Sequence, residues 1–370
     1  MPHSNITRSQ KFFFQAFPPA EFLMMNFVGI DISEHAVRFV EFVSTPKHLK
    51  LGRFGERTLP EGTILSGEIK DPGTLKTALI GLRREHNLSF VRASLPEEKA
   101  FLFRKEIPNY ISSEEIRENI AFQLEEYVPI KVMDAEFDYS LAEPLFDKAT
   151  PGTREVVVSV FPKSTVESYL DAYLSAGLTP LSFEMEGSSL QRALIESGDM
   201  GTYMIADMGR LRTSLAIVSK GAVHFTSTIE VGGEVITEAI EKSLSVSRDE
   251  AEKLKIEGAF SHHGKYRELF PALIESSRTL TDQIKKHYVY WHNHPDKKDS
   301  SPPAIEKVIL CGGDANLEGL AEHLALSLRT FVVVGNVWTN AFSTDNYIPP
   351  LSRAESLSYA SAIGLALREI

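Results

Sequence analysis

Two aspartates stand at matching places in the sequence, each at the end of an apolar strand and just before a tight turn. Asp31 ends the stretch Phe27-Val-Gly-Ile-Asp, Asp207 ends Tyr203-Met-Ile-Ala-Asp, and a second apolar strand follows each turn. Both patterns predict a hairpin with a carboxylate at its tip. The two aspartates are separated by close to half of the 370-residue chain, which suggests two related halves.

A pair of carboxylates on facing turns has a defined chemistry. Across a cleft, the two side chains can hold Mg²⁺ while neighbouring backbone N–H groups receive phosphate oxygens. Gly209 would let the backbone approach a phosphate closely, and Thr213 would add a hydroxyl. The alternative is two unrelated aspartates in ordinary turns, and the repeated pattern at half-chain spacing argues against it.

Two glycine pairs in the second half are further candidates. Gly312-Gly313 follows an apolar strand, where missing side chains leave room for a flat ligand. Gly232-Gly233 precedes a helix, whose N-terminus can bind a phosphate. Taken alone, Gly312-Gly313 is also common at ordinary strand-to-helix turns, and Gly232-Gly233 fits a plain helix start as well as it fits a phosphate site. The chain has no Gly-x-x-x-x-Gly-Lys-Ser/Thr stretch, which argues against a P-loop ATPase.

Three histidines offer a different kind of site, a metal centre. His287, His292 and His294 are close in sequence but lie beside a polar, Pro-rich linker at 293–303, without nearby thiols. A zinc site is therefore the weaker interpretation. The single cysteine, Cys311, excludes an intrachain disulfide framework and fits a reducing cytosol.

Length and charge narrow the function classes. A chain of 370 residues suggests about two domains. A net charge of −11 argues against a large nucleic-acid surface but not against a nucleotide pocket. No uninterrupted apolar run reaches 18 residues, so no membrane-spanning helix is predicted. Pro18-Pro19 cuts short the apolar run near the N-terminus, so a disordered or weakly interfacial tail is favoured over a signal peptide, and Met24 or Met25 could be the natural start.

The elements that must position these residues alternate between strands and helices, as in an α/β protein. Residues 101–107, 112–127, 134–142 and 154–161 predict a small β-α-β-β unit inserted into the first half. Outside this unit and the hairpins, predicted helices cover 71–85, 163–176, 188–196, 234–243, 247–256, 266–291, 317–326 and 354–368. Predicted strands cover 52–67 (with a turn), 90–95, 181–183, 306–314 (ending in the glycine turn) and 331–334.

The order of these pieces resembles that of the actin/Hsp70/sugar-kinase ATPase superfamily. Within it, the chain resembles the PilM family of type IV pilus assembly proteins, which is related to the division protein FtsA. The resemblance covers residues 26–368 and is carried by Val28-Gly-Ile-Asp-Ile, Leu95-Pro-Glu-Glu-Lys, Ala121-Phe-Gln-Leu-Glu-Glu-Tyr-Val-Pro, Ala206-Asp-Met-Gly, Val231-Gly-Gly-Glu-Val-Ile-Thr, Ala251-Glu-Lys-Leu-Lys and Ala362-Ile-Gly-Leu-Ala-Leu-Arg.

The resemblance implies an actin-like (ribonuclease H-like) α/β fold, with duplicated domains around a nucleotide cleft. After a tail at 1–25, the first core subdomain would comprise 26–98 and 163–200, with the inserted subdomain at 99–162. The second core subdomain would comprise 201–232 and 304–370, and a helical subdomain on the nucleoside side would cover 233–303.

The resemblance also implies ATP and Mg²⁺ as cofactors and gives each candidate residue a role. Asp31 and Asp207 would occupy the two phosphate motifs and hold the Mg²⁺, with Gly209 and Thr213 in the second motif. Glu186 falls where relatives place the residue that orients the attacking water. The other cofactor-binding residues would lie along the phosphates, ribose and nucleoside: Gly232, Gly233, Glu252, Lys255, Gly312 and Gly313.

The first phosphate turn departs from the family pattern. Ser33 replaces the usual glycine, which would cost about 1–2 kcal/mol if the turn needs a positive φ. Glu34 would bring a negative charge toward the phosphates. The sequence therefore predicts weakened ATP binding and weak or absent hydrolysis.

The resemblance implies a place in a membrane machine without direct membrane contact. The protein would lie at the cytoplasmic face of the inner membrane and bind the N-terminal cytoplasmic tail of PilN in a groove lined by parts of 101–130 and the adjoining core. Other pilus-platform components, the assembly motor and further copies of the chain are expected partners; nucleic acid is not. A small-molecule kinase is less favoured because no second catalytic aspartate stands out. An FtsA-like filament ATPase is less favoured because no amphipathic helix follows residues 354–368.

Overall fold

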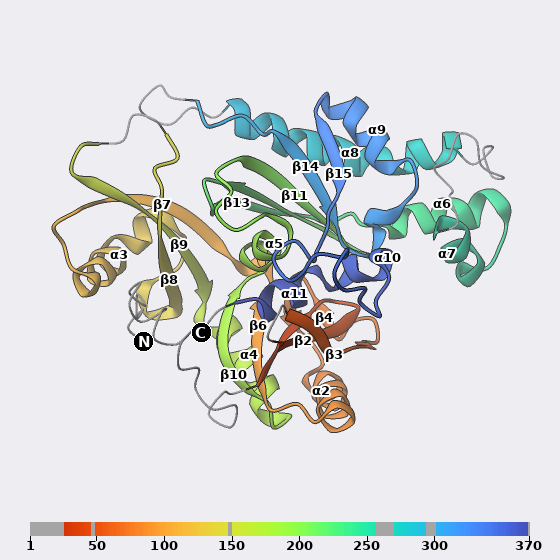
Figure 1. Cartoon of the computed structure of the whole chain (residues 1–370), viewed down its shortest axis with the longest axis horizontal. Coiled ribbons are helices and arrows are strands. Elements are labelled where there is room, and N and C mark those ends of the chain that lie inside the picture. The colour runs from red at the N-terminus through yellow and green to blue at the C-terminus, as the bar shows by residue number, and fades with distance from the viewer. Residues whose placement is uncertain (1–25, 46–48, 147–149, 257–269, 294–300, 369–370) are drawn as a thin grey trace.

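The computed structural model describes residues 26–45, 49–146, 150–256, 270–293 and 301–368, and places two five-stranded sheets one above the other (Figure 1). The first sheet has the strand order β10-β6-β1-β2-β3 and the second β13-β12-β11-β14-β15. The first is built from β1 (Phe27–Ile32), β2 (Ala36–Ser44), β3 (Leu49–Thr58), β6 (Phe90–Leu95) and β10 (Thr179–Met185). The second is built from β11 (Thr202–Met208), β12 (Thr213–Ser219), β13 (Ala222–Ile229), β14 (Lys307–Cys311) and β15 (Phe331–Val334).

The two sheets repeat one topology, which confirms the predicted actin-like duplication. In each, a three-stranded antiparallel meander begins with the strand that carries the aspartate, and that strand also pairs in parallel with a later one: β1 with β6, and β11 with β14. Asp31 is opposite Arg38 in the first hairpin, and Asp207 is opposite Ser214 in the second. Apolar side chains on both faces of the central strands explain why they are buried as parallel strands.

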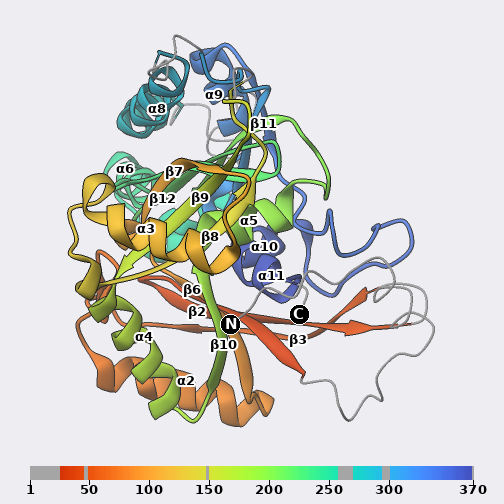
Figure 2. The ribbon, with the colours of Figure 1, turned by 90° about the vertical axis from the view of Figure 1, so that its left-hand side faces the viewer.

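Helices cover the outer face of the first sheet and fill the space between the sheets. Helices α2 (Pro72–His86) and α4 (Lys163–Ser175) pack beneath the first sheet, while α11 (Ala360–Ala366) lies on its other side against α5 (Glu186–Leu194) (Figure 2). Helices α6 (Glu234–Leu244), α7 (Arg248–Ile256), α8 (Phe270–Asn293) and α9 (Leu320–Leu328) belong to the second half. No helix of the described residues is long and apolar enough to cross a membrane.

The expected β-α-β-β unit is present as a separate three-stranded sheet. Its order is β7-β9-β8, formed by β7 (Phe101–Pro108), β8 (Ala135–Ala142) and β9 (Thr153–Pro162). Helix α3 (Ser113–Tyr127) covers it with a stripe at Ile116, Ile120 and Leu124. A capping box begins this helix, since the side chains of Ser112 and Glu115 bond to each other's backbone N–H groups.

The C-terminal helix expected at 354–368 is interrupted. The chain forms α10 (Arg353–Ser356), a 3₁₀ turn at Leu357–Tyr359 and then α11. The break has a tertiary cause, because the Leu357 carbonyl accepts a hydrogen bond from the N–H of Gly312 at 3.1 Å. Similarly, the helix expected to begin at 317 begins at Leu320, after a 3₁₀ turn at 313–316. A short hairpin of β4 (Ile64–Leu65) and β5 (Glu68–Ile69) follows β3. The predicted tail at 1–25 and the linker segment 294–300 lie outside the described residues.

Candidate functional site

The two aspartates project from equivalent hairpins of the two halves. Asp31 is half-buried and accepts a hydrogen bond from the hydroxyl of Ser94 at 2.6 Å. Burial raises the pKa of Asp207 to about 7, the negative charge of Asp31 adds to this rise, and Arg38 opposes it. The charge of Asp31 therefore acts on Asp207 across the space between the hairpins. Ser94 was missed, because a lone serine at the end of a strand carries no distinctive signal.

Glu186 lies at the first position of α5, close to the same carboxylates. Burial, followed by the charges of Asp31, Glu98, Glu97 and Asp207, holds its pKa well above the usual range. Its nearest hydrogen-bond donor is the Ser214 hydroxyl at 3.5 Å. The surrounding acids and the burial thus oppose ionisation of Glu186.

A further acid, Glu97, contacts the start of α5 and was not among the predicted site residues. It is 5% exposed and accepts a hydrogen bond from the N–H of Gly187 at 3.1 Å, at the start of α5. Burial raises its pKa to about 7. The oxygen Oε1 of Glu97 is buried without a hydrogen-bond partner. The stretch Leu95-Pro-Glu-Glu-Lys was recognisable as a family motif, but the role of its first glutamate depends on a contact with residue 187.

The first phosphate turn closes without glycine and without strain. The N–H of Ser33 donates to the Ala36 carbonyl at 2.9 Å, and the Ser33 hydroxyl donates to the same carbonyl at 3.0 Å. Ser33 is absent from the described non-glycine residues with positive φ, so the strain cost considered for it does not arise. Glu34 is not an unpaired charge either, since its carboxylate accepts from Arg212 at 3.0 Å and from the N–H of Ser66 at 2.6 Å.

The second predicted phosphate turn, at Asp207–Gly209, packs directly on the Gly232-Gly233 pair. The N–H of Gly233 donates to the Gly209 carbonyl at 3.0 Å. A Cβ at Gly232 would lie 2.4 Å from the same carbonyl oxygen, so only glycine fits there. Thr213 is fully buried and donates its hydroxyl to the Val231 carbonyl at 2.9 Å. Thr213 therefore joins the start of β12 to the loop at Val231, and its hydroxyl points to the carbonyl of that loop.

The predicted nucleoside-side residues gather around Asp314. The buried Lys255 bonds to Asp314 at 2.8 Å and to Glu252 at 3.0 Å, and Glu252 accepts from the Thr237 hydroxyl at 2.8 Å. A Cβ at Gly233 would lie 2.1 Å from a carboxylate oxygen of Asp314. These contacts bring Gly233, Glu252 and Lys255 together around one buried carboxylate.

The two glycines of the Gly312-Gly313 pair have different roles. Gly312 has φ = +90°, and a Cβ there would lie 2.4 Å from a carboxylate oxygen of Asp207. Gly312 is thus needed for the turn that sets the β14 end against the second aspartate. At Gly313 the nearest atom to an added Cβ is 4.0 Å away, in Ser358. Space therefore remains in front of Gly313, as a flat ligand would require.

The structure does not support the histidine alternative. His287 lies within hydrogen-bond distance of the Ser227 hydroxyl and His292 of the Tyr288 carbonyl, and His294 lies outside the described residues. Over the ranges that the structure describes, no three or more His, Cys, Asp or Glu side chains form a group that could hold a metal ion by themselves. Two aspartates are nevertheless a suitable Mg²⁺ pair when nucleotide phosphates and water complete the shell.

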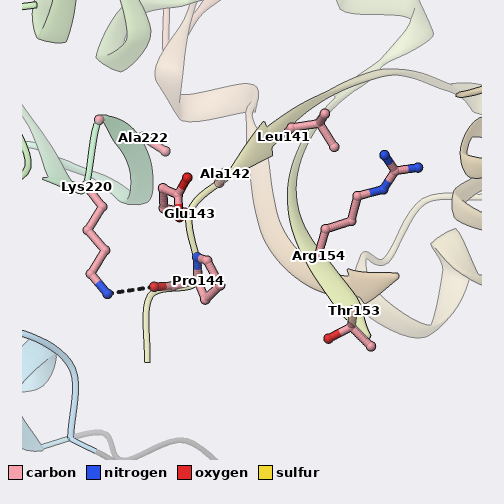
Figure 3. Close-up of a pocket in the computed structure, with 9 residues that line it drawn as sticks. Leu141, Ala142, Glu143, Pro144, Thr153, Arg154, Lys220 and Ala222 are labelled. Carbon is pink, nitrogen blue, oxygen red and sulfur yellow. Dashed lines mark hydrogen bonds between the residues drawn. The ribbon is translucent and has the colours of Figure 1, made fainter. Parts of the chain in front are cut away.

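A separate surface depression of about 460 Å³ lies away from these residues (Figure 3). It separates the β8–β9 connection of the inserted unit from the β12–β13 turn, and the Lys220 ammonium donates to the Pro144 carbonyl at 2.8 Å beside it. Arg154 and Leu141 form the opposite wall. None of the predicted nucleotide residues lines this depression, and it borders the second half instead of the first core.

Comparisons with known sequences agree with this arrangement. The family model described as type IV pilus assembly protein PilM matches residues 29–370. The cell division protein FtsA of Enterococcus hirae is 26% identical over 227 residues, which is 55% of this chain and 51% of FtsA. The chain thus spans about half the length of this curated relative.

Comparisons with solved structures agree on the fold. A PilM-PilN type IV pilus biogenesis complex matches with a TM-score of 0.74 and 22% identity, over 93% of this chain and 98% of that one. MreB 5 of Spiroplasma citri bound to AMPPNP matches with a TM-score of 0.52 and 12% identity, over 92% and 95%. At these identities, the likenesses establish the actin-like fold alone.

Proposed function

The chain belongs to the family of type IV pilus assembly protein PilM, and from this premise we propose that it is an actin-like scaffold that binds Mg²⁺–ATP and the N-terminal tail of PilN. It would act at the cytoplasmic face of the inner membrane, where its partners and not the chain itself contact the lipid. The observation that carries the nucleotide part is the pair of half-buried aspartates on equivalent hairpins, where the charge of Asp31 acts on Asp207.

Each part of the site has a role in this proposal. Asp31 and Asp207 would hold the Mg²⁺, which neutralises phosphate charge. Backbone N–H groups near Gly209 and Gly232 would face phosphate oxygens. The space at Gly313 would take the adenosine, and the ion pair of Glu252 and Lys255 would border the site beside Gly233.

The division into two core subdomains, an inserted subdomain at 99–162 and a helical subdomain at 233–303 is part of the same proposal.

Turnover is proposed to be weak. Glu186 would orient the attacking water, and it could accept that water's proton only as an ionised carboxylate. Its pKa is held well above the usual range by burial and by four neighbouring acids. Mg²⁺ would lower that pKa only in part, because Glu97 and Glu98 stay close to it.

Titration calorimetry with Mg²⁺–ATP tests the nucleotide site. Wild type is expected to bind, and Asp207→Asn to lose at least about tenfold in affinity because one Mg²⁺ ligand becomes neutral. Affinity for Mg²⁺–ATP should also rise between pH 6 and pH 8, since Asp207 must lose its proton near pH 7 before it can hold a cation. Glu238→Gln, an exposed change on α6, is the matched control. No heat at millimolar nucleotide would contradict the nucleotide site.

A synthetic peptide with the N-terminal sequence of PilN from the same genome tests the partner. We expect binding by wild type and by Asp207→Asn alike, because the proposed groove uses parts of 101–130 and the adjoining first core. Fluorescence anisotropy of the labelled peptide measures it, with a scrambled peptide as control. Failure of the wild type to bind would remove the PilN part and leave the nucleotide part standing.

A further inference from the structure

One arginine joins both halves at the mouth of the proposed cleft. Arg212, at the tip of the β11–β12 hairpin, bonds to Glu34 at 3.0 Å and to Glu98 at 2.9 Å. Glu34 belongs to the β1–β2 turn and Glu98 to the 3₁₀ turn after β6, so both acids are part of the first half. The three side chains are only 12–18% exposed, which places this cluster between surface and core.

A serine from a third segment completes the cluster. Ser66, in the turn between β4 and β5, accepts from Arg212 on its hydroxyl at 2.9 Å and donates its N–H to Glu34 at 2.6 Å. Ser66 has φ = +50°, a conformation that non-glycine residues adopt at a cost. Ser66 and Gly67 (φ = +71°) are the two central residues of this hairpin turn, both with positive φ, and the turn holds Ser66 where it bonds both Arg212 and Glu34.

The neighbouring arginine makes a second bridge between the halves. Arg210 bonds to Glu234 at 2.9 Å and lies 3.2 Å from the Nε2 atom of His35, in the β1–β2 turn. The two turns that would surround the phosphates are therefore cross-linked by side chains. Arginine is well suited to such a role, since its planar guanidinium bonds carboxylates and phosphates in the same fork geometry.

We propose that Arg212 is a charge latch: it holds the two hairpins together in the nucleotide-free protein, and the phosphates of a bound nucleotide compete with Glu34 and Glu98 for its guanidinium. The competition with phosphates rests on the proposed nucleotide site, whereas the closing of the two hairpins by Arg212 does not. The proposal gives a role to Glu34, which stands where the family has a small residue. Glu34 is the carboxylate through which Arg212 closes the cleft. When a nucleotide binds, its phosphates replace the carboxylates of Glu34 and Glu98 at the Arg212 guanidinium.

The closing function is tested without nucleotide. Cysteines introduced at the exposed Lys76 on α2 and Lys253 on α7 carry spin labels on the two sides of the cleft, and the native Cys311 is buried and unreactive (Figure 1). In Arg212→Gln, the label-to-label distance distribution should broaden and shift to longer values. Arg278→Gln, which removes a surface arginine of α8 paired within its own helix, should leave the distribution unchanged. An unchanged distribution in Arg212→Gln would overturn the latch.

The competition is tested with Mg²⁺–ATP in calorimetry. Glu98→Gln and Glu34→Gln should each bind it about three- to tenfold more tightly than wild type, since a competitor for Arg212 is gone. Arg212→Gln should bind it more weakly. Equal or weaker binding by both glutamine variants would overturn the competition. If wild type binds no nucleotide, the proposed function and the competition fall together, while the spin-label distances still decide whether Arg212 closes the cleft.

Discussion

Acidic side chains crowd the corner where α5 meets the two hairpins. Glu97 and Asp207 both have their pKa raised to about 7, and the pKa of Glu186 is held well above its usual range, in each case chiefly by burial. A folded protein that keeps such groups gives up stability when they ionise. Carboxylates with strongly raised pKa values gathered in one place are common at functional sites.

Glu97→Gln should make stability less sensitive to pH. The folded-state pKa of Glu97 is about 7 and its unfolded value is about 4.3, so the folded wild type binds the proton more tightly and loses stability as pH rises from about 4 to 7. The glutamine is neutral throughout and still accepts from the N–H of Gly187. We expect the variant to gain on the order of 2 kcal/mol over wild type between pH 5 and pH 8, measured by urea unfolding. A constant difference across this range would show that Glu97 does not ionise on this scale.

The sequence predicted the residues whose signal is local. Asp31, Asp207 and the two glycine pairs follow strands in recognisable patterns, and the structure brings them to the facing hairpins and the Asp314 cluster. Ser94, Glu97 and Arg212 could not be assigned, because each acts through a contact with a residue more than 60 positions away.

At the scale of elements, the turn after β14 couples the second aspartate to the C-terminal segment. The N–H of Gly312 bonds to the Leu357 carbonyl, and its Cα faces the Asp207 side chain with no room for a Cβ. This contact also interrupts the predicted C-terminal helix. Helical periodicity over 354–368 is continuous, so only the tertiary partner could reveal the break.

The two glycines of this turn should respond differently to substitution. Gly312→Ala should lower the free energy of unfolding by about 2 kcal/mol or more, because it combines a positive φ with a clash against Asp207 and the Met208 backbone. Gly313→Ala meets no atom closer than 4.0 Å and should unfold like wild type. Thermal denaturation compares them. If Gly313→Ala nevertheless weakens ATP binding, the methyl group occupies ligand space, which is the role proposed for this position.

At the scale of the whole molecule, α11 is the element that both halves share. It packs against β1 through Gly29, where a Cβ would lie 2.1 Å from the Ala362 carbonyl oxygen, and against α5 through Gly364. The predicted series of strands and helices could be assigned from periodicity and capping residues. The position of this last helix, between the sheets and against the first strand, depends on contacts between residues far apart in the sequence, which periodicity does not reveal.

Gly364→Ala should disturb the junction of the two halves. Its Cβ would lie 1.8 Å from the Ser189 carbonyl oxygen, and both neighbours are backbone of helices that cannot move apart cheaply. We expect a loss of about 2–3 kcal/mol in the free energy of unfolding, measured in urea. Gly73→Ala, on the exposed first turn of α2, should be neutral or slightly stabilising. Equal stabilities of the two variants would contradict the close contact between α11 and α5.

The packing of α11 on Gly29 also has a consequence for biosynthesis. The strand that starts the fold is covered on one face by a helix made from the last tenth of the chain. While the ribosome is still working, the first sheet can form its strand pairs but must keep that face open, so the usual order in which an N-terminal unit matures before the next is synthesised does not apply. Maturation of both halves would therefore be a single late event.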